Sequence, residues 1–90
     1  SQEADPRDLR VVLLPQAQED LDGVQEPLLG RVLKRLETLK RFPDLGAPMA
    51  GPFAGYRSTV VELFRIVYRV LPTRAIEVSY VRDCRRRPPR

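Results

Sequence analysis

The sequence predicts an α+β fold of two layers, in which a helical hairpin packs on one face of a mainly antiparallel four-stranded sheet. The 90 residues, of which 42% are hydrophobic and 31% charged, suit one small globular domain. Apolar residues recur at helical spacing in two segments before residue 43, and they alternate with polar residues after residue 55. The resulting order of strand, helix, helix, strand, strand, strand favours helices packed over a sheet.

The first half of the chain begins with a polar segment, residues 1–9, which we expect to be flexible. The apolar run Arg10-Val11-Val12-Leu13-Leu14 predicts a strand, and Pro15 ends it and suits the first turn of a helix. Residues 16–24 keep apolar side chains at helical spacing. A second helix is predicted before Pro43, where five apolar residues form one stripe: Leu29, Val32, Leu33, Leu36 and Leu39.

The second half of the chain contains the other predicted strands. Residues 43–55 hold three Pro and three Gly and predict a loop. Three strand candidates follow it, namely Tyr56–Glu62, Leu63–Leu71 and Ala75–Arg82. The tripeptide Pro72-Thr73-Arg74 fits a tight turn between the last two. These elements define one domain over residues 10–84, followed by a basic tail at residues 85–90.

The charge is unevenly distributed along the chain. Residues 1–45 carry seven Lys or Arg and nine Asp or Glu, whereas residues 46–90 carry nine Arg and three acidic residues. The net charge is therefore −2 in the first half and +6 in the second. Because guanidinium groups bind phosphate oxygens in pairs and do not deprotonate, the arginine-rich half favours recognition of an anionic partner.

The composition disfavours several kinds of site. Cys84 is the single cysteine and there is no histidine, which excludes an internal disulfide and disfavours a zinc site or a Cys–His nucleophile. We therefore expect no metal and no cofactor. No apolar run approaches the ~20 residues that span a membrane, and the start lacks the features of a signal peptide. A soluble, cytoplasmic protein with no membrane partner is expected.

The segment Phe64–Val70 is the most informative for function, because arginine alternates there with large apolar residues. Arg65 and Arg69 share one strand face and predict a phosphate clamp. Alternatively, Arg69 pairs across strands with Glu62 or Glu77. The opposite face is predicted to pack on the core and consists of Phe64, Ile66, Tyr68 and Val70.

The ordered combination of these segments resembles the RelE/ParE superfamily, the toxins of bacterial type II toxin–antitoxin pairs. The resemblance runs from about Arg10 to Arg86. Its pieces are a strand ending in Leu13-Leu14-Pro15, an acidic first helix, a Leu-rich second helix ending in Phe42-Pro43-Asp44-Leu45-Gly46, then Gly55-Tyr56-Arg57, Phe64–Val70, and Ile76-Glu77-Val78 leading to Arg85-Arg86.

The resemblance implies a toxin that is held inactive by a cognate antitoxin, which we expect to be acidic where it binds. RelE-like members cleave mRNA in the ribosomal A site, whereas ParE-like members poison DNA gyrase. We expect a ribosome-dependent, metal-independent mRNA endonuclease. The alternatives are a ParE-like gyrase inhibitor and a toxin fold that retains only antitoxin binding.

The resemblance also implies site residues. Arg57, Arg65 and Arg86 (or its neighbour Arg85) fall at positions that hold the scissile phosphate in RelE-like toxins. Further RNA contacts are expected from Arg69, Arg85 and Arg87. Arginine is a poor proton donor or base, so the candidate general acids and bases are Glu62, Glu77, Tyr80 and Asp83. Tyr56 and Tyr68 are interpreted either as sheet-packing aromatics or as platforms for stacked bases.

Overall fold

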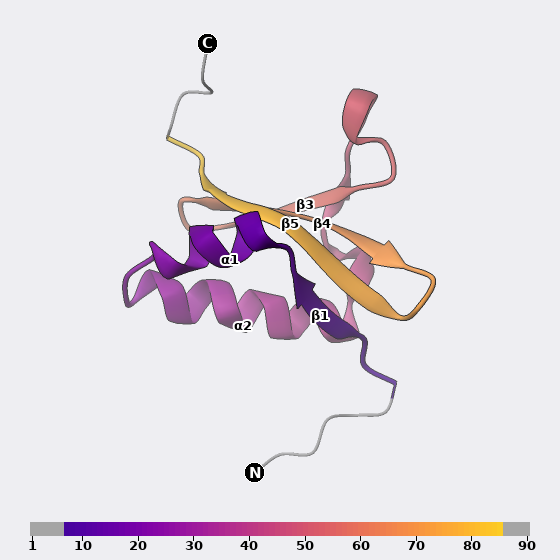
Figure 1. Cartoon of the computed structure of the whole chain (residues 1–90), viewed down its shortest axis with the longest axis horizontal. Helices are drawn as coiled ribbons and strands as arrows, with labels where there is room; N and C mark the ends of the chain where they lie inside the picture. Colours follow the sequence, from indigo (N-terminus) through magenta and orange to yellow (C-terminus); the bar gives the residue numbers. More distant parts are fainter. Residues whose placement is uncertain (1–6, 86–90) are drawn as a thin grey trace.

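A computed structural model describes residues 7–85 of the chain. The predicted site residues Arg86 and Arg87 lie outside these residues, as do most of the predicted N-terminal segment and basic tail. The described part forms two layers, with the helices α1 and α2 on one face of a single sheet (Figure 1). The predicted α+β fold is confirmed.

The elements follow the predicted order with one addition. The helices are α1 (Pro15–Asp22) and α2 (Leu28–Arg41), and two short 3₁₀ turns are η1 (Pro43–Leu45) and η2 (Gly51–Phe53). The strands are β1 (Arg10–Leu13), β2 (Ala47–Pro48), β3 (Arg57–Val61), β4 (Phe64–Leu71) and β5 (Ala75–Asp83). None of the helices in residues 7–85 is long and apolar enough to span a membrane.

The sheet has five strands in the order β1-β5-β4-β3-β2, so the predicted count of four was one too low. The extra strand, β2, contains only Ala47 and Pro48, which pair with Ser58 and Arg57. Two residues in a Pro- and Gly-rich loop carry no alternation of apolar and polar side chains, and sequence periodicity therefore does not reveal them. β1 is parallel to β5, and the other neighbouring strands are antiparallel.

Two tight turns join the last three strands. The β3–β4 turn consists of Glu62 and Leu63, and Glu62 adopts a φ of 54°. The β4–β5 turn follows at Pro72-Thr73-Arg74, where Arg74 has a φ of 63°. Because both connections are short, the three strands form one antiparallel meander whose register determines which side chains share a face.

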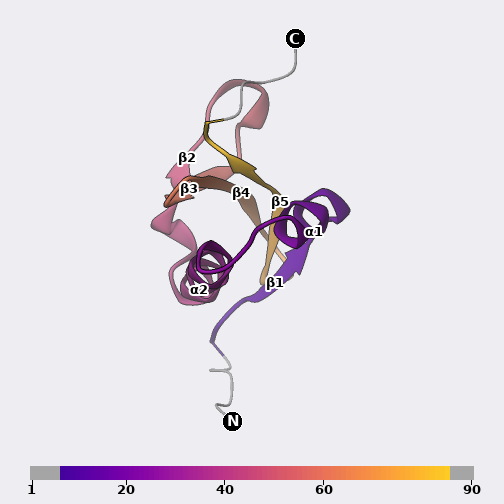
Figure 2. The same cartoon turned by 90° about the vertical axis from the view of Figure 1, so that its left-hand side faces the viewer.

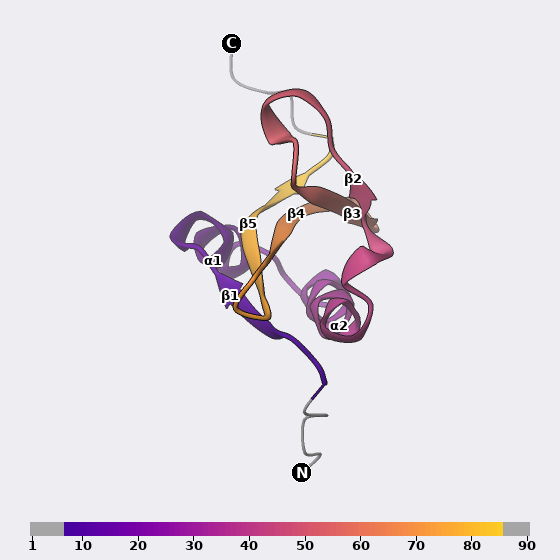
Figure 3. The same cartoon turned by 90° about the vertical axis from the view of Figure 1, so that its right-hand side faces the viewer.

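The hydrophobic core lies between the sheet and the two helices (Figures 2 and 3). The stripe predicted on α2 supplies Val32, Leu36 and Leu39 to it, whereas Leu33, which was also predicted to belong to the stripe, is 44% exposed. Of the residues predicted to face the core from β4, Ile66 and Tyr68 are fully buried and Phe64 packs against the cluster. Val70 is 42% exposed, contrary to the prediction, because the tip of the β4–β5 hairpin extends beyond the helices (Figure 1).

A β-bulge interrupts the β4–β5 ladder at one point. Tyr68 pairs with Val78, but the preceding residue of β4, Val67, pairs with Tyr80, so Ser79 is an extra residue in β5. A bulge of this kind exchanges the faces to which all later side chains of the strand point. The end of β5 beyond Ser79 therefore presents a different set of side chains than strict alternation would give.

Candidate functional site

The candidate site lies on the open face of the sheet, which we define as the face opposite α1 and α2. Val67 points to this face. It is fully buried, but it does not belong to the hydrophobic cluster between the sheet and the helices. The strand register arranges the side chains around it in rows across β3, β4 and β5. The rows are Val60, Arg65 and Arg82; then Ser58, Val67 and Tyr80; then Arg69 and Glu77.

Arg65 and Arg82 form the most unusual feature of the open face, and we call them the arginine pair. They lie directly opposite each other on β4 and β5. Both are exposed, and neither has an ion pair or hydrogen bond to another residue in the range 7–85. Like charges at directly opposed positions destabilise a sheet by about 0.2–1 kcal/mol. A fixed anion between the two guanidiniums would offset this repulsion.

The bulge at Ser79 is what brings Arg82 to this position. If the register of the β4–β5 turn continued unchanged, Arg65 would face Val81 and Arg82 would point toward the core. Sequence reasoning missed Arg82 for this reason. The available signal is the spacing of the buried residues of β5, which changes from two residues between Ile76 and Val78 to three between Val78 and Val81.

Among the candidate acid–base groups, Tyr80 lies on the open face in the row next to the arginine pair. The Arg82 guanidinium carbon lies 4.7 Å from the centroid of the Tyr80 ring. A cation over an aromatic face is attracted to the ring electrons, so this contact orients Arg82. The arrangement places two cations and one phenolic hydroxyl on a rigid part of the sheet.

Arg69 shares the open face with Arg65, as predicted, but it does not form a clamp with it. Four residues of strand separate their Cα atoms by about 13 Å. The Nε of Arg69 donates to Glu77 Oε1 at 2.7 Å, and its guanidinium carbon lies 5.3 Å from the ring centroid of Tyr56. The hydrogen bond and charge of Glu77 raise the pKa of Arg69. Arg69 is thus held within its own row, one of the alternatives predicted for it.

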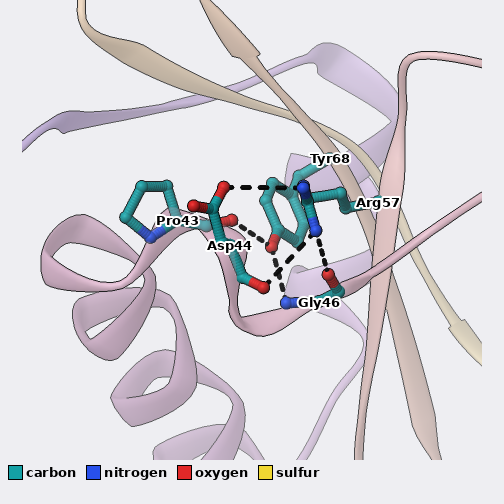
Figure 4. Close-up of polar contacts among 5 residues, drawn as sticks. All are labelled: Pro43, Asp44, Gly46, Arg57 and Tyr68. Carbon is teal, nitrogen blue, oxygen red and sulfur yellow. Dashed lines mark hydrogen bonds and ion pairs between the residues drawn. The ribbon is translucent and has the colours of Figure 1, made fainter.

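Arg57 lies on the helix side of the sheet, away from the arginine pair, because it pairs with the core residue Tyr68. Its Nη1 donates to the carbonyl of Gly46 at 2.7 Å, and Nη2 lies 3.5 Å from Asp44 Oδ1 (Figure 4). The resemblance grouped Arg57 with Arg65. The structure separates them. Arg57 pairs with Tyr68, whose side chain points into the core, whereas Arg65 pairs with Val60 on the open face.

Arg57 instead belongs to a group of hydrogen-bonded residues that holds the segment after α2 against the sheet. We call this group the latch; it consists of Pro43, Asp44, Gly46, Arg57 and Tyr68. The Tyr68 hydroxyl donates to the Pro43 carbonyl at 2.6 Å and accepts from the Gly46 amide at 2.9 Å (Figure 4). Burial is the main cause of the raised pKa of Tyr68. Of the two readings of this tyrosine, the structure supports the packing aromatic.

Removing the Tyr68 hydroxyl is expected to destabilise the fold. Tyr68→Phe leaves the Gly46 amide and the Pro43 carbonyl without this partner, and an unsatisfied buried group costs about 1–3 kcal/mol. Chemical denaturation at neutral pH measures the change in the free energy of unfolding. An unchanged midpoint would show that the two hydrogen bonds contribute nothing net.

The same substitution is expected to change the alkaline stability profile. With a pKa raised above the ordinary 10.0, Tyr68 stays protonated in the folded state at a pH where the unfolded chain has ionised. Its stabilising contribution is therefore complete below pH 10 and is lost as the pH rises toward the folded-state pKa. The difference in unfolding free energy between wild type and Tyr68→Phe should shrink above pH 10. A constant difference would contradict this assignment.

The other predicted acid–base groups are already bound to arginines. Glu62 forms an ion pair with Arg31 of α2 at 2.8 Å. Asp83 Oδ2 lies 2.9 Å from Nη2 of Arg85, and the hydrogen bond and charge of Asp83 raise the pKa of Arg85. The charge of Arg85, which lies two residues beyond the end of β5, is therefore balanced by Asp83. Within residues 7–85, no group of three or more His, Cys, Asp or Glu side chains is placed to hold a metal ion.

Comparison with known proteins identifies a family of similar sequences. The model for the ParE toxin of the type II toxin–antitoxin system parDE matches residues 11–88, which is most of the chain. Comparison with curated proteins found no match.

Solved structures show the same fold at low sequence identity. The toxin–antitoxin complex RelBE2 from Mycobacterium tuberculosis matches with a TM-score of 0.77 and 23% identity, over 84% of this chain and 98% of that one. The intact E. coli RelBE toxin–antitoxin complex gives 0.73 and 15%, over 87% and 99%. The chromosomal ParDE system from P. aeruginosa gives 0.68 and 15%, over 86% and 97%.

Proposed function

The chain belongs to the ParE toxin family of type II toxin–antitoxin systems, and we propose that it acts as a ribosome-dependent mRNA endonuclease through the open face of its sheet. The observation that supports this activity is the arginine pair. Arg65 and Arg82 are two exposed guanidiniums, directly opposed on rigid strands, with no carboxylate partner among residues 7–85. Such a pair matches the two non-bridging oxygens of a phosphodiester.

The proposed reaction is attack of the RNA 2′-hydroxyl oxygen on the adjacent phosphorus, with the hydroxyl proton passing to solvent water. The bond to the 5′-oxygen of the next nucleotide breaks, and that oxygen takes up a proton. Arg65 and Arg82 stabilise the negative charge that accumulates on the phosphorane oxygens, the role for which preorganised donors are most effective. Tyr80, whose ring centroid lies 4.7 Å from the Arg82 guanidinium carbon, is the group that we assign to donate the proton to the leaving oxygen.

We also propose a cognate antitoxin, acidic in its binding segment, as the partner that controls this surface. Carboxylates placed over Arg65 and Arg82 would neutralise the arginine pair and prevent phosphate from entering. The similar structures in M. tuberculosis and E. coli are themselves toxin–antitoxin complexes.

A gyrase inhibitor is the second candidate, and one observation favours it. Three of the four candidate acid–base groups, Glu62, Glu77 and Asp83, are already bound to arginines. An inhibitor that acts through a protein interface needs no proton transfer, so this pairing would not matter to it. The description of the matching family model, a parDE toxin, is consistent with this alternative.

Two assays with the purified chain distinguish these functions. We expect a defined mRNA to be cut in a cell-free translation system and to stay intact when ribosomes are omitted, as judged by primer extension. DNA supercoiling by gyrase should be unaffected. Inhibition of supercoiling with intact mRNA would replace the first proposal by the second. No effect in either assay would indicate a fold that retains only antitoxin binding.

A further inference from the structure

A second surface on the open face lies at the other end of β4 from the arginine pair. It consists of Phe53, Tyr56 and Arg69, which we call the aromatic platform. Tyr56 and Phe53 belong to the loop between β2 and β3, which projects away from the helices on the side of the open face (Figure 1). The rings of Phe53 and Tyr56 meet edge to face, with centroids 6.2 Å apart and planes at 83°.

Each member of the platform is held in place by a neighbour. Arg69 is positioned on one side by the ring of Tyr56 and at its Nε by the Glu77 carboxylate. The backbone amide of Tyr56 donates to the carbonyl of Phe53 at 2.9 Å, which closes the turn that carries Phe53. The platform is therefore preorganised, although the Arg69 side chain remains 43% exposed and Phe53 41% exposed.

The charge of the platform differs from that of the arginine pair. The Glu77 carboxylate balances the charge of Arg69 at a contact distance of 2.7 Å, whereas Arg65 and Arg82 have no such counter-charge among residues 7–85. An anion is thus attracted to the arginine pair more than to the platform. A neutral guanidinium–carboxylate pair beside two aromatic rings suits a flat, uncharged group, and unpaired nucleobases stack on both arginine planes and aromatic rings.

From this geometry we infer that the aromatic platform binds an unpaired nucleobase of a single strand whose phosphate lies at the arginine pair. The two surfaces are about 13 Å apart along β4, so they contact different nucleotides of one strand. The inference rests on the proposed function for the phosphate contact, but the base contact is a separate property of Phe53, Tyr56 and Arg69. It assigns Arg69 to base stacking and not to phosphate binding.

The test compares two probes that differ only in their bases. One is a fluorescein-labelled deoxyuridine oligonucleotide, whose deoxyribose backbone lacks the 2′-hydroxyl needed for cleavage. The other is an abasic deoxyribose strand of the same length. Fluorescence anisotropy with the full chain should show tighter binding of the base-bearing strand by about 5- to 150-fold, the range for one stacked base.

Substitutions on the platform should remove this preference alone. Phe53→Ala, at an exposed loop position, and Arg69→Lys, which keeps the charge but lacks the guanidinium plane, should both weaken binding of the base-bearing strand and leave abasic binding unchanged. Phe42→Ala is the matched control, because Phe42 is 60% exposed but follows α2 in the other layer. It should change neither affinity.

The outcomes separate the platform from the phosphate site. Equal affinity of the wild-type chain for both strands would overturn the assignment of the platform. The same conclusion would follow if Phe53→Ala lowered the affinity for both strands equally. If Arg65→Gln leaves abasic binding unchanged, the phosphate assignment fails while a base preference still supports the platform. If the wild-type chain binds neither strand, both assignments fail.

Discussion

We expect induced expression of the chain to arrest growth, and we expect Arg82→Gln to relieve this arrest as strongly as Arg65→Gln. Each substitution removes one of the two guanidiniums that would stabilise charge on the phosphorane, and loss of one such donor typically lowers the rate by about 10²–10³-fold. Growth after induced expression and mRNA cleavage in a translation system both report the effect.

The folded state should respond in the opposite direction. Because Arg65 and Arg82 are like charges at directly opposed positions, Arg82→Gln removes a repulsion and should leave the melting temperature unchanged or slightly higher. Loss of activity without loss of stability distinguishes a phosphate contact from a structural residue. Arg57→Gln should behave differently. Arg57 donates a hydrogen bond to the Gly46 carbonyl, and loss of this hydrogen bond should lower the melting temperature.

Arg41→Gln is the control for a general effect of charge. Arg41 is 65% exposed at the end of α2, on the other side of the molecule from the open face, and lies 3.7 Å from Asp8. We expect this variant to remain toxic. Full toxicity of Arg82→Gln, or equal relief by Arg41→Gln, would refute the assignment of the arginine pair.

Gly46→Ala is expected to be among the most destabilising single substitutions in the described part of the chain. A Cβ at this position would lie 2.7 Å from the Tyr68 hydroxyl oxygen, 2.8 Å from its Cε1 and 2.9 Å from the Ser58 carbonyl oxygen. Both neighbours are fixed, since Tyr68 is fully buried and Ser58 lies within β3. The latch would have to open, with loss of the hydrogen bonds to the Tyr68 hydroxyl.

Overpacking costs about 1–3 kcal/mol and an unsatisfied buried group a similar amount, so we expect a loss of about 2–6 kcal/mol. For a domain of this size that corresponds to a fall in melting temperature of at least about 8 °C. Gly23→Ala is the matched control, because a Cβ there would meet only the Asp20 carbonyl oxygen, at 3.6 Å. Thermal unfolding should show little change for Gly23→Ala. A similar small change for Gly46→Ala would contradict the tight packing of the latch.

The fold could be predicted well because its signals are local. The stripe from Leu29 to Leu39 predicts the helix α2, and Pro15 marks where β1 gives way to α1. The strands β3, β4 and β5 follow the predicted segments closely. The exception is β2, whose two residues become a strand only because they pair with Arg57 and Ser58.

The site could be predicted only in part. Alternation along β4 correctly placed Arg65 and Arg69 on one face, because side chains of a regular strand point alternately to its two sides. The partner of Arg65 depends on the register of another strand, and the bulge at Ser79 moved Arg82 opposite it. The position of Arg57 likewise depends on the pairing of β3 with β4, which directs its side chain toward Tyr68 and the Gly46 carbonyl.

The sequence by itself determined the two-layer fold and the arginine-rich second half of the chain, since these depend on composition and on periodicities within single segments. The family followed from the resemblance of its ordered segments to known toxins, and the match of the family model to residues 11–88 confirmed it. Only the tertiary structure decided which arginines lie opposite each other. That choice depends on strand register and on ion pairing, which leave Arg65 and Arg82 facing each other and bind Arg57, Arg69 and Arg85 to other groups. Contacts between strands distant in sequence set both properties, and a shift of one residue reverses the face to which a side chain points.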